Sequence, residues 1–442
     1  MSLTRFMPPM RFSGSAAKPL LPALGTALLL ACAAPAVQAQ AQPAAAAAPA
    51  ASAASAPAFT VRPEVGTALN QAIDLFRAGK ADQARATIEQ AQTAIPNLQP
   101  AEATVLNRVR GLVEMQLEQY AAAAQSLQAA LAAGAQSPQD ALQCREALAR
   151  AYFNLKAYAD AAKAAREAQA AGSKAAAVQA VLVRATYLQN DFKGSVDLLE
   201  AQARREGKLA LEDLRLLASA YGNLKDDANY IRLAEQLLRE HGRQEYWPDL
   251  MARVQRQPGW QPRWDIDLYR LRLQRGMMEE PDDYLVLAEM AAKAGLPAEA
   301  QQVLDAGFAK GVLGKGAAAA EQERLRASIT RQARDDRASL ETAAARPPAL
   351  GDARAAANTF NTGAALVAIG TFEPGLALMK AALAASLPDG DQARLQYGQA
   401  LAAAGKPTEA AAAFQQLADR PGLGLLARLW ALAVAVPAPR QG

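Results

Sequence analysis

Histidine is almost absent from this chain of 442 residues, which contains only His241. Hydrolytic triads, zinc sites and most proton relays depend on imidazole groups, so no multi-histidine constellation can form. Cysteine is equally scarce, because Cys32 and Cys144 are the two examples in the sequence. These absences predict a protein that is not an enzyme, binds no metal and carries no cofactor.

Aromatic residues are also few, at 5% of the sequence, although 51% of it is hydrophobic. Most of the apolar content is therefore Ala and Leu, which are strong helix formers. The 28 Gly and 25 Pro are scattered between helical stretches, as expected if they end many short helices. The composition predicts an all-α protein built from short helices.

A strong charge of one sign is lacking too, since the net charge is +4. Three of the cations, Arg5, Arg11 and Lys18, lie in the first 39 residues, which hold no Asp or Glu. The rest of the chain is therefore close to neutral. Nucleic-acid-binding proteins usually display a basic stripe or tail, so no nucleic-acid partner is expected.

The first 39 residues have the three parts of a bacterial secretory signal peptide. A basic start is followed by an apolar run from Leu20 to Ala31 and by the small-residue ending Val37-Gln38-Ala39. The apolar run is too short and too interrupted to serve as a transmembrane anchor. We therefore expect export to the periplasm, with residues 40–60 forming a disordered Ala/Pro-rich tail.

Cys32 leaves a second possibility open, because Leu29-Leu30-Ala31-Cys32 resembles a lipobox. Lipidation at Cys32 would make the protein an outer-membrane lipoprotein, and this is the only case in which a membrane is an expected partner. Cleavage after Ala39 would remove that cysteine. Cys144 is predicted to be a small helix residue of the array rather than a reactive thiol, because no partner Cys or His is near it in the sequence.

The remaining chain repeats itself with a period near 34 residues, which is typical of helix-turn-helix arrays. In eight units the first small apolar position recurs, at residues 72, 111, 149, 183, 218, 288, 363 and 398. Small residues allow two antiparallel helices to cross closely, and Gly or Pro ends each helix. Richness in Ala alone would not place Tyr120, Tyr158 and Phe192 at one equivalent position. The predicted fold is a tetratricopeptide-type αα superhelix, a solenoid of antiparallel helix pairs.

Two irregular gaps divide the array. The gap between positions 218 and 288 holds a degenerate unit with a turn at Pro258-Gly259, and the next gap holds a charged helix that ends at Pro347-Pro348. The second gap suggests two subarrays. The predicted divisions are an N-terminal array (61–242), degenerate plus regular units (243–316), a charged helical spacer (317–350) and C-terminal units with a capping helix (351–442).

Part of the chain goes beyond the generic repeat. The run from Glu245 to Gly314, which begins EYWPDLMARVQRQPGW, and the later segment GLLARLWALA resemble a group of exported proteobacterial tetratricopeptide proteins. Members of this group are often encoded beside TonB, ExbB and ExbD, which energise outer-membrane transport. The resemblance implies an adaptor in the cell envelope, and it supplies no defined ligand residues.

The first helix of each pair is expected to line the concave face of such a solenoid, where a partner would bind. Arginines alternate there with apolar anchors, and these are the predicted partner-binding residues: Phe76, Arg108, Met115, Arg150, Phe153, Arg184, Tyr187 and Arg215. This mixture suits an extended or helical peptide with some acidic character. The alternative is a solvated face whose apolar residues only pack the helices together.

The sequence thus favours a non-catalytic periplasmic scaffold that binds proteins or peptides of the cell envelope, accessory to a complex such as the TonB system. An outer-membrane lipoprotein that assists pilus, secretion or envelope assembly is the alternative, and Cys32 distinguishes the two. A helical-repeat lyase or transferase is disfavoured by the shortage of histidine and of converging polar residues.

Overall fold

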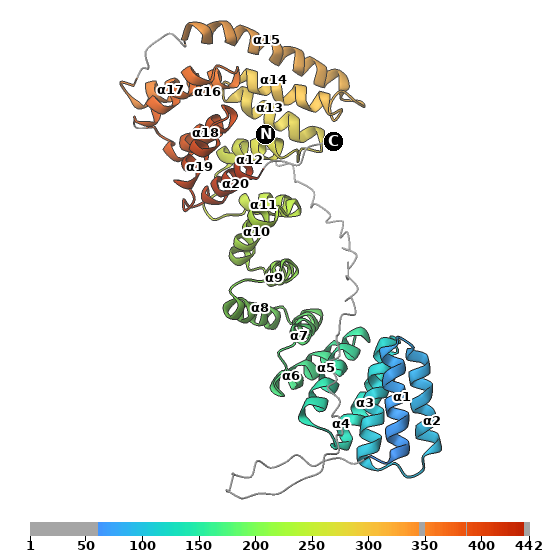
Figure 1. Cartoon of the computed structure of the whole chain (residues 1–442). Coiled ribbons are helices and arrows are strands. Elements are labelled where there is room, and N and C mark those ends of the chain that lie inside the picture. Colours follow the sequence, from blue (N-terminus) through green and yellow to red (C-terminus); the bar gives the residue numbers. More distant parts are fainter. Residues whose placement is uncertain (1–60, 344–349, 386, 437–442) are drawn as a thin grey trace, which may run out of the picture. The chain divides into compact units, whose positions relative to one another are not determined.

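A computed structural model describes residues 61–343, 350–385 and 387–436 of the chain (Figure 1). These ranges contain twenty α-helices, two short 3-10 helices and no strand. The predicted all-α class is confirmed. The predicted signal peptide (1–39) and tail (40–60) lie outside the described residues. None of the described helices has the length and apolar character needed to cross a bilayer.

The first ten helices form five consecutive antiparallel pairs, which correspond to the first five predicted units. They are α1 (Pro63–Arg77) and α2 (Ala81–Ala94), α3 (Pro100–Gln116) and α4 (Tyr120–Ala133), α5 (Pro138–Asn154) and α6 (Tyr158–Ala170), α7 (Ala176–Leu188) and α8 (Phe192–Glu206), and α9 (Leu211–Leu224) and α10 (Asp227–His241). Each helix packs on the next along the chain.

Shorter helices follow in the degenerate unit, and pairs then resume. The remaining elements are η1 (Gln244–Tyr246), α11 (Trp247–Val254), η2 (Pro262–Trp264), α12 (Asp265–Gln274), α13 (Pro281–Lys293), α14 (Pro297–Ala309), α15 (Ala319–Ala343), α16 (Ala353–Ala368), α17 (Phe372–Leu383), α18 (Gly390–Ala403), α19 (Pro407–Gln415) and α20 (Gly424–Ala435).

Small residues set the distance between paired helices, as the repeat pattern predicts. Ala72 and Ala149 are fully buried at their crossings. At Gly111 a β-carbon would lie 2.7 Å from Leu127 Cγ, and at Gly363 it would lie 2.7 Å from the carbonyl oxygen of Gly375. No larger side chain fits at these two crossings without moving the partner helix.

The turns inside the pairs adopt a left-handed backbone conformation whether or not a glycine is present. Gly79 turns at φ 74° after α1. In the next four units the equivalent turn uses a residue with a side chain, at φ between 57° and 63°: Glu118, Lys156, Asn190 and Lys225. Each non-glycine residue in this region costs about 1–2 kcal/mol, so helix packing on both sides must hold these turns in place.

The first helices of successive pairs also contact one another, from α1 to α3, α3 to α5 and α5 to α7. Such contacts align the first helices along one side of the array. The predicted partner-binding residues of α1, α3, α5, α7 and α9 all belong to these first helices. We call the surface that these five helices present the first-helix face.

The degenerate unit and helix α20 share one hydrophobic core. Trp247 on α11 and Trp264 on η2 are buried in it together with Phe414 and Trp430. Helix α20 contacts α18 and α19 but also α10, α11 and α12, and eight of its twelve residues are buried. The segment predicted as a capping helix therefore covers the last pair and at the same time joins it to the middle of the chain (Figure 1).

The charged helix α15 packs along α14, where Ile329 and Leu340 enter a second core shared with α13 and α16. The Gln322 side chain accepts a hydrogen bond of 2.7 Å from the backbone N–H of Gly314. Arg326 donates to the Asp305 carboxylate at 2.7 Å. The segment predicted as a spacer thus contributes one apolar side to the fold, although residues 344–349 lie outside the description.

Candidate functional site

Two predicted arginines of the first-helix face are only partly accessible. Arg108 on α3 is bonded to the Asp140 carboxylate on α5, and its side chain is 18% exposed. Burial lowers the pKa of Arg150, and the charge of Glu146 opposes that shift. The Arg108 guanidinium thus joins two neighbouring units, whereas Arg150 is half-buried on α5, and neither is fully open to a partner.

The predicted apolar anchors lie half-buried between units. Phe76 packs against the core of the first pairs, and Met115 and Phe153 pack against the core of α4 to α7. The Phe153 and Tyr158 rings are 5.7 Å apart. Their inner surfaces therefore pack the helices, as the alternative interpretation of the face requires, and their outer surfaces remain accessible.

The remaining predicted residues lie on α7 and α9. The Tyr187 hydroxyl is 2.6 Å from Ser219 Oγ, which joins the two helices. Burial raises the pKa of Asp213, and the charge of Arg184 opposes this shift. Arg215 is the most open of the arginines considered, with 42% of its side chain exposed and a weak pair to Glu212 at 3.4 Å.

Arg215 stands at the edge of a polar hollow of about 420 Å³ between α9, α10 and α11. Ser219, Asn223, Tyr246 and Arg253 also line this hollow. Arg253 donates to Asp249 at 2.8 Å and lies over the Tyr230 ring at 4.1 Å from its centroid, so it is already engaged. Burial raises the pKa of Tyr246, and the charge of Arg215 opposes this. The exposed guanidinium beside hydroxyl and amide groups suits a carboxylate or a peptide backbone.

Three exposed leucines lie at the ends of first helices and were not among the predicted residues. Leu155, Leu188 and Leu224 end the first helices α5, α7 and α9, and they are 40%, 44% and 42% exposed. Leu155 and Leu224 directly precede the left-handed turn residues Lys156 and Lys225, and Leu188 lies two residues before Asn190, so an alignment of the turns could have identified them. Singly such residues are ordinary, but a row of three offers apolar contact area to an elongated partner.

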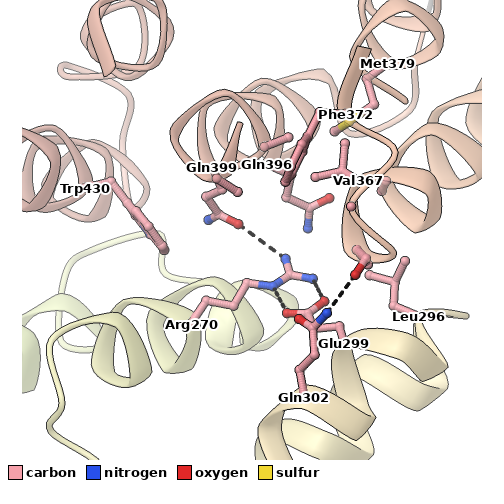
Figure 2. Close-up of a pocket in the computed structure, with 15 residues that line it drawn as sticks. Arg270, Leu296, Glu299, Gln302, Val367, Phe372, Met379, Gln396, Gln399 and Trp430 are labelled. Carbon is pink, nitrogen blue, oxygen red and sulfur yellow. Dashed lines mark hydrogen bonds and ion pairs between the residues drawn. The ribbon is translucent and has the colours of Figure 1, made fainter. Parts of the chain in front are cut away.

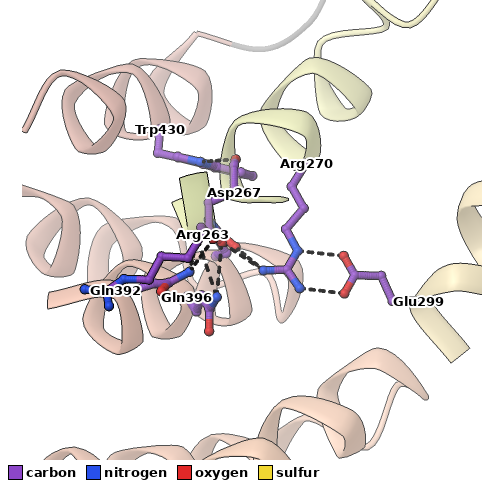
Figure 3. Close-up of polar contacts among 8 residues, drawn as sticks. Arg263, Asp267, Arg270, Glu299, Gln392, Gln396 and Trp430 are labelled. Atoms are coloured by element: carbon purple, nitrogen blue, oxygen red, sulfur yellow. Dashed lines mark hydrogen bonds and ion pairs between the residues drawn. The ribbon is translucent and has the colours of Figure 1, made fainter. Parts of the chain in front are cut away.

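A second polar cluster, also absent from the sequence predictions, closes the C-terminal pairs onto the degenerate unit (Figure 3). Asp267 on α12 is fully buried and accepts hydrogen bonds from Gln392, Gln396 and Gln399 on α18. Arg270 donates to Asp267 at 2.9 Å. Burial raises the pKa of Asp267, while Arg270 and the glutamine donors oppose the shift.

Arg270 extends this cluster to α14, because it donates to both Glu299 oxygens at 2.6 and 2.7 Å. The Trp430 indole N–H donates to the Asp267 carbonyl at 3.1 Å and ties α20 to the same point. We call Asp267, Arg270, Glu299 and the three glutamines the junction cluster. Its members come from three helices that are far apart in the sequence.

Reactive groups are scarce in the described part of the chain. Cys144 is fully buried, and burial raises the pKa of its thiol to about 11. Among residues 61–343, 350–385 and 387–436, no group of three or more His, Cys, Asp or Glu side chains is arranged to hold a metal ion.

Comparison with protein-family models gives no match, and comparison with curated proteins gives none either. Among solved structures, the chain is similar to a tetratricopeptide repeat protein from Parabacteroides merdae, with 11% identity over 76% of this chain and 99% of that one, at a TM-score of 0.34. It is also similar to the Naa15/Naa10 complex bound to HypK, with 16% identity over 82% of this chain and 59% of that one, at a TM-score of 0.37. For the TPR2AB domain of yeast Sti1 in its pHSP90 complex the identity is 14%, over 60% and 98% of the two chains, at a TM-score of 0.27. The helix pairing of this chain, described above, itself establishes its tetratricopeptide-type architecture.

Proposed function

We propose that this protein is a non-catalytic scaffold that binds a peptide segment of a partner protein along its first-helix face. The observation that carries the proposal is the polar hollow at Arg215 on α9, the last of the five helices that form this face. Helix arrays present extended surfaces of this kind to elongated partners.

The chemistry of the face favours a partner segment with acidic and apolar residues. Arg215 offers open hydrogen-bond donors, and Ser219 and Asn223 offer further polar groups in the hollow. An acidic side chain would pair with Arg215 while an apolar neighbour contacts Leu188. Arg108 contributes less because it is paired with Asp140, and Arg150 contributes less because its side chain is half-buried.

Site-specific photo-crosslinking in intact cells tests the binding face. A crosslinking residue at Leu188 should capture a defined partner, whereas the same residue at Lys193 on α8, a second helix, should not; Lys193 is 76% exposed. Arg215→Glu should reduce capture about ten-fold or more, as expected for loss of a charge-assisted contact. Arg204→Glu on α8 is the matched control, because Arg204 is also a surface arginine paired with a glutamate. Equal capture from both positions, or equal loss with both charge reversals, would refute a specific face.

The proposed location is the periplasm, with a role accessory to an envelope complex such as the TonB system. The secretory-type leader, the lipobox-like segment and the resemblance of Glu245–Gly314 to exported repeat proteins support it. The competing proposal is an outer-membrane lipoprotein that assists pilus, secretion or envelope assembly.

The mass of the mature protein separates these two locations. An N-terminus at Gln40 supports the unanchored periplasmic form, and a lipidated N-terminus at Cys32 supports the lipoprotein. Retention of the leader in a cytoplasmic fraction would refute both. Crosslinking from Leu188 then identifies whether the captured partner belongs to a TonB-type complex.

A further inference from the structure

A second hollow, of about 340 Å³, lies between α12, α14, α16, α17, α18 and α20, and Arg270, Glu299, Gln396 and Gln399 of the junction cluster line it (Figure 2). Its apolar walls are formed by Leu296, Val367, Phe372, Met379 and Trp430. Leu296, Met379 and Trp430 are at most 7% exposed, so these walls are fixed by the core. The volume is at the lower end of the range of about 300–1,000 Å³ found for small-molecule sites.

The polar wall of this hollow carries more negative than positive charge. Arg270 and Glu299 line it, and Arg270 also pairs with Asp267 directly behind. One guanidinium thus serves two carboxylates. Asp267 accepts hydrogen bonds from Arg270 and three glutamine amides, and these donors favour its carboxylate form against the burial that raises its pKa.

Three cations on neighbouring elements do not supply the missing positive charge, because each has a carboxylate of its own. The pairs are Arg263 with Asp389 at 2.8 Å, Lys293 with Glu289 at 3.3 Å and Lys406 with Glu373 at 2.9 Å. These three cations therefore do not neutralise Glu299 or Asp267.

Unused hydrogen-bond acceptors face the same space. Each Glu299 oxygen accepts one N–H from Arg270 and keeps a second acceptor position, and the side chain is 20% exposed. Within the described residues, the amide oxygen of Gln396 receives no hydrogen bond, because only its amino group is engaged, by Asp267. A ligand that uses these acceptor positions must therefore donate hydrogen bonds to them.

We propose that this hollow binds a small organic ammonium ion, whose N–H groups donate to Glu299 and Gln396 and whose apolar body lies against Phe372, Met379 and Trp430. The positive charge of the ammonium group balances the charge of the second carboxylate. The apolar body of the ligand, about one ring or one short chain in size, is buried from water. The site is distinct from the first-helix face and does not depend on the proposed function.

Isothermal titration calorimetry of the exported chain at pH 7 tests the proposal with three matched probes. 2-Phenylethylamine should bind about ten-fold or more tightly than 2-phenylethanol, because a charge-assisted hydrogen bond exceeds a neutral one. 3-Phenylpropanoate should not bind measurably. The proposal is overturned if the alcohol binds as well as the amine, if the acid binds better, or if no probe binds saturably.

Variants connect the binding to the hollow. Glu299→Gln should abolish the preference for the amine over the alcohol, whereas Glu289→Gln, a carboxylate 65% exposed on α13, should leave it unchanged. Ala403→Phe places a ring into the hollow from its exposed rim and should eliminate binding of the amine and the alcohol without lowering the melting temperature. If Glu299→Gln does not fold, Ala403→Phe still tests the site. Unchanged binding of the amine to Ala403→Phe would refute the site.

A peptide probe tests whether the ammonium group that binds in the hollow is instead the N-terminus of a polypeptide. A Phe-Gly-Gly tripeptide should bind more weakly than 2-phenylethylamine, because the hollow has room for one small molecule and the two glycines would have to extend outside it. Tighter binding of the tripeptide, lost on N-acetylation, would overturn the small-molecule proposal in favour of a polypeptide N-terminus.

Discussion

Replacing Asp267 by Asn should selectively destabilise the C-terminal half of the protein. The substitution keeps the shape of the side chain but removes its charge and turns one of its two oxygens into a donor. That new donor faces N–H groups that already point at it, from Arg270 at 2.9 Å or from Gln392 at 2.9 Å, according to which way the amide turns. At least one buried donor therefore loses its acceptor.

The expected loss follows from the burial of the pair. Removing one partner of a buried ion pair costs about 3–5 kcal/mol. Arg270 is 14% exposed and keeps both hydrogen bonds to Glu299, so we expect the lower end, about 3 kcal/mol. With a urea m-value of about 1–3 kcal/mol/M, the midpoint of the affected transition should fall by roughly 1–3 M.

Tryptophan fluorescence is the natural assay, because all four tryptophans (Trp247, Trp260, Trp264 and Trp430) lie in the part of the chain that the junction cluster closes. Circular dichroism reports on all helices at once. Because the stability of a repeat array is largely local, the fluorescence midpoint should fall while the N-terminal helices keep their own transition.

The control is Glu289→Gln, which neutralises an exposed partner of Lys293 and should change stability by no more than about 0.5 kcal/mol. If the fluorescence midpoint of Asp267→Asn coincides with that of Glu289→Gln, the junction cluster does not hold the C-terminal pairs in place. A uniform shift of all helical signal would instead show that the chain unfolds as one cooperative unit.

Two further predictions concern the ends of the array. Hydrogen bonds from the Arg62 side chain, and then from the backbone of Gln99 and Arg62, lower the pKa of Glu102 from 4.5 to about 2, so its stabilising contribution is present above pH 4.5 and lost as the pH falls toward 2. The urea midpoint of the wild type should fall across this window more than that of Glu102→Gln, and parallel curves would contradict the role of the Arg62–Glu102 pair. Gly363→Ala should cost about 1–3 kcal/mol, because the methyl group would lie 2.7 Å from the Gly375 carbonyl oxygen. Gly390→Ala at the start of α18 meets nothing within 4 Å and should be neutral or stabilising by up to about 1 kcal/mol, so equal melting temperatures for the two variants would refute the close crossing.

The first-helix face shows how much of a candidate binding surface a repeat pattern can predict. The period places Arg108, Arg150 and Arg215 on first helices, because position in a unit depends only on local spacing. It does not reveal that Arg108 pairs with Asp140 of the next unit, whereas Arg215 keeps an open side chain. Whether these arginines bind a partner stays a prediction.

Helix α20 carried a sequence signal with a clear physical meaning. Leu425, Leu426, Leu429 and Trp430 cover more than one side of the helix, and a helix that is apolar all round must be buried on several faces. A capping helix needs one polar face. The composition could therefore have predicted burial, although it could not have identified α10, α11 and α12 as the covering helices.

The sequence by itself determined the helices, their pairing and the turns, because these depend on contacts within about forty residues: small residues at crossings, Gly or Pro at helix ends and apolar residues at helical spacing. Only the tertiary structure decided the junction cluster and the hollow beside it. Asp267 is 125 residues from Gln392, and a polar side chain at either position is indistinguishable in sequence from one facing water. Such long-range polar contacts form only after packing brings α12, α14 and α18 together, and no periodicity records which helices will meet.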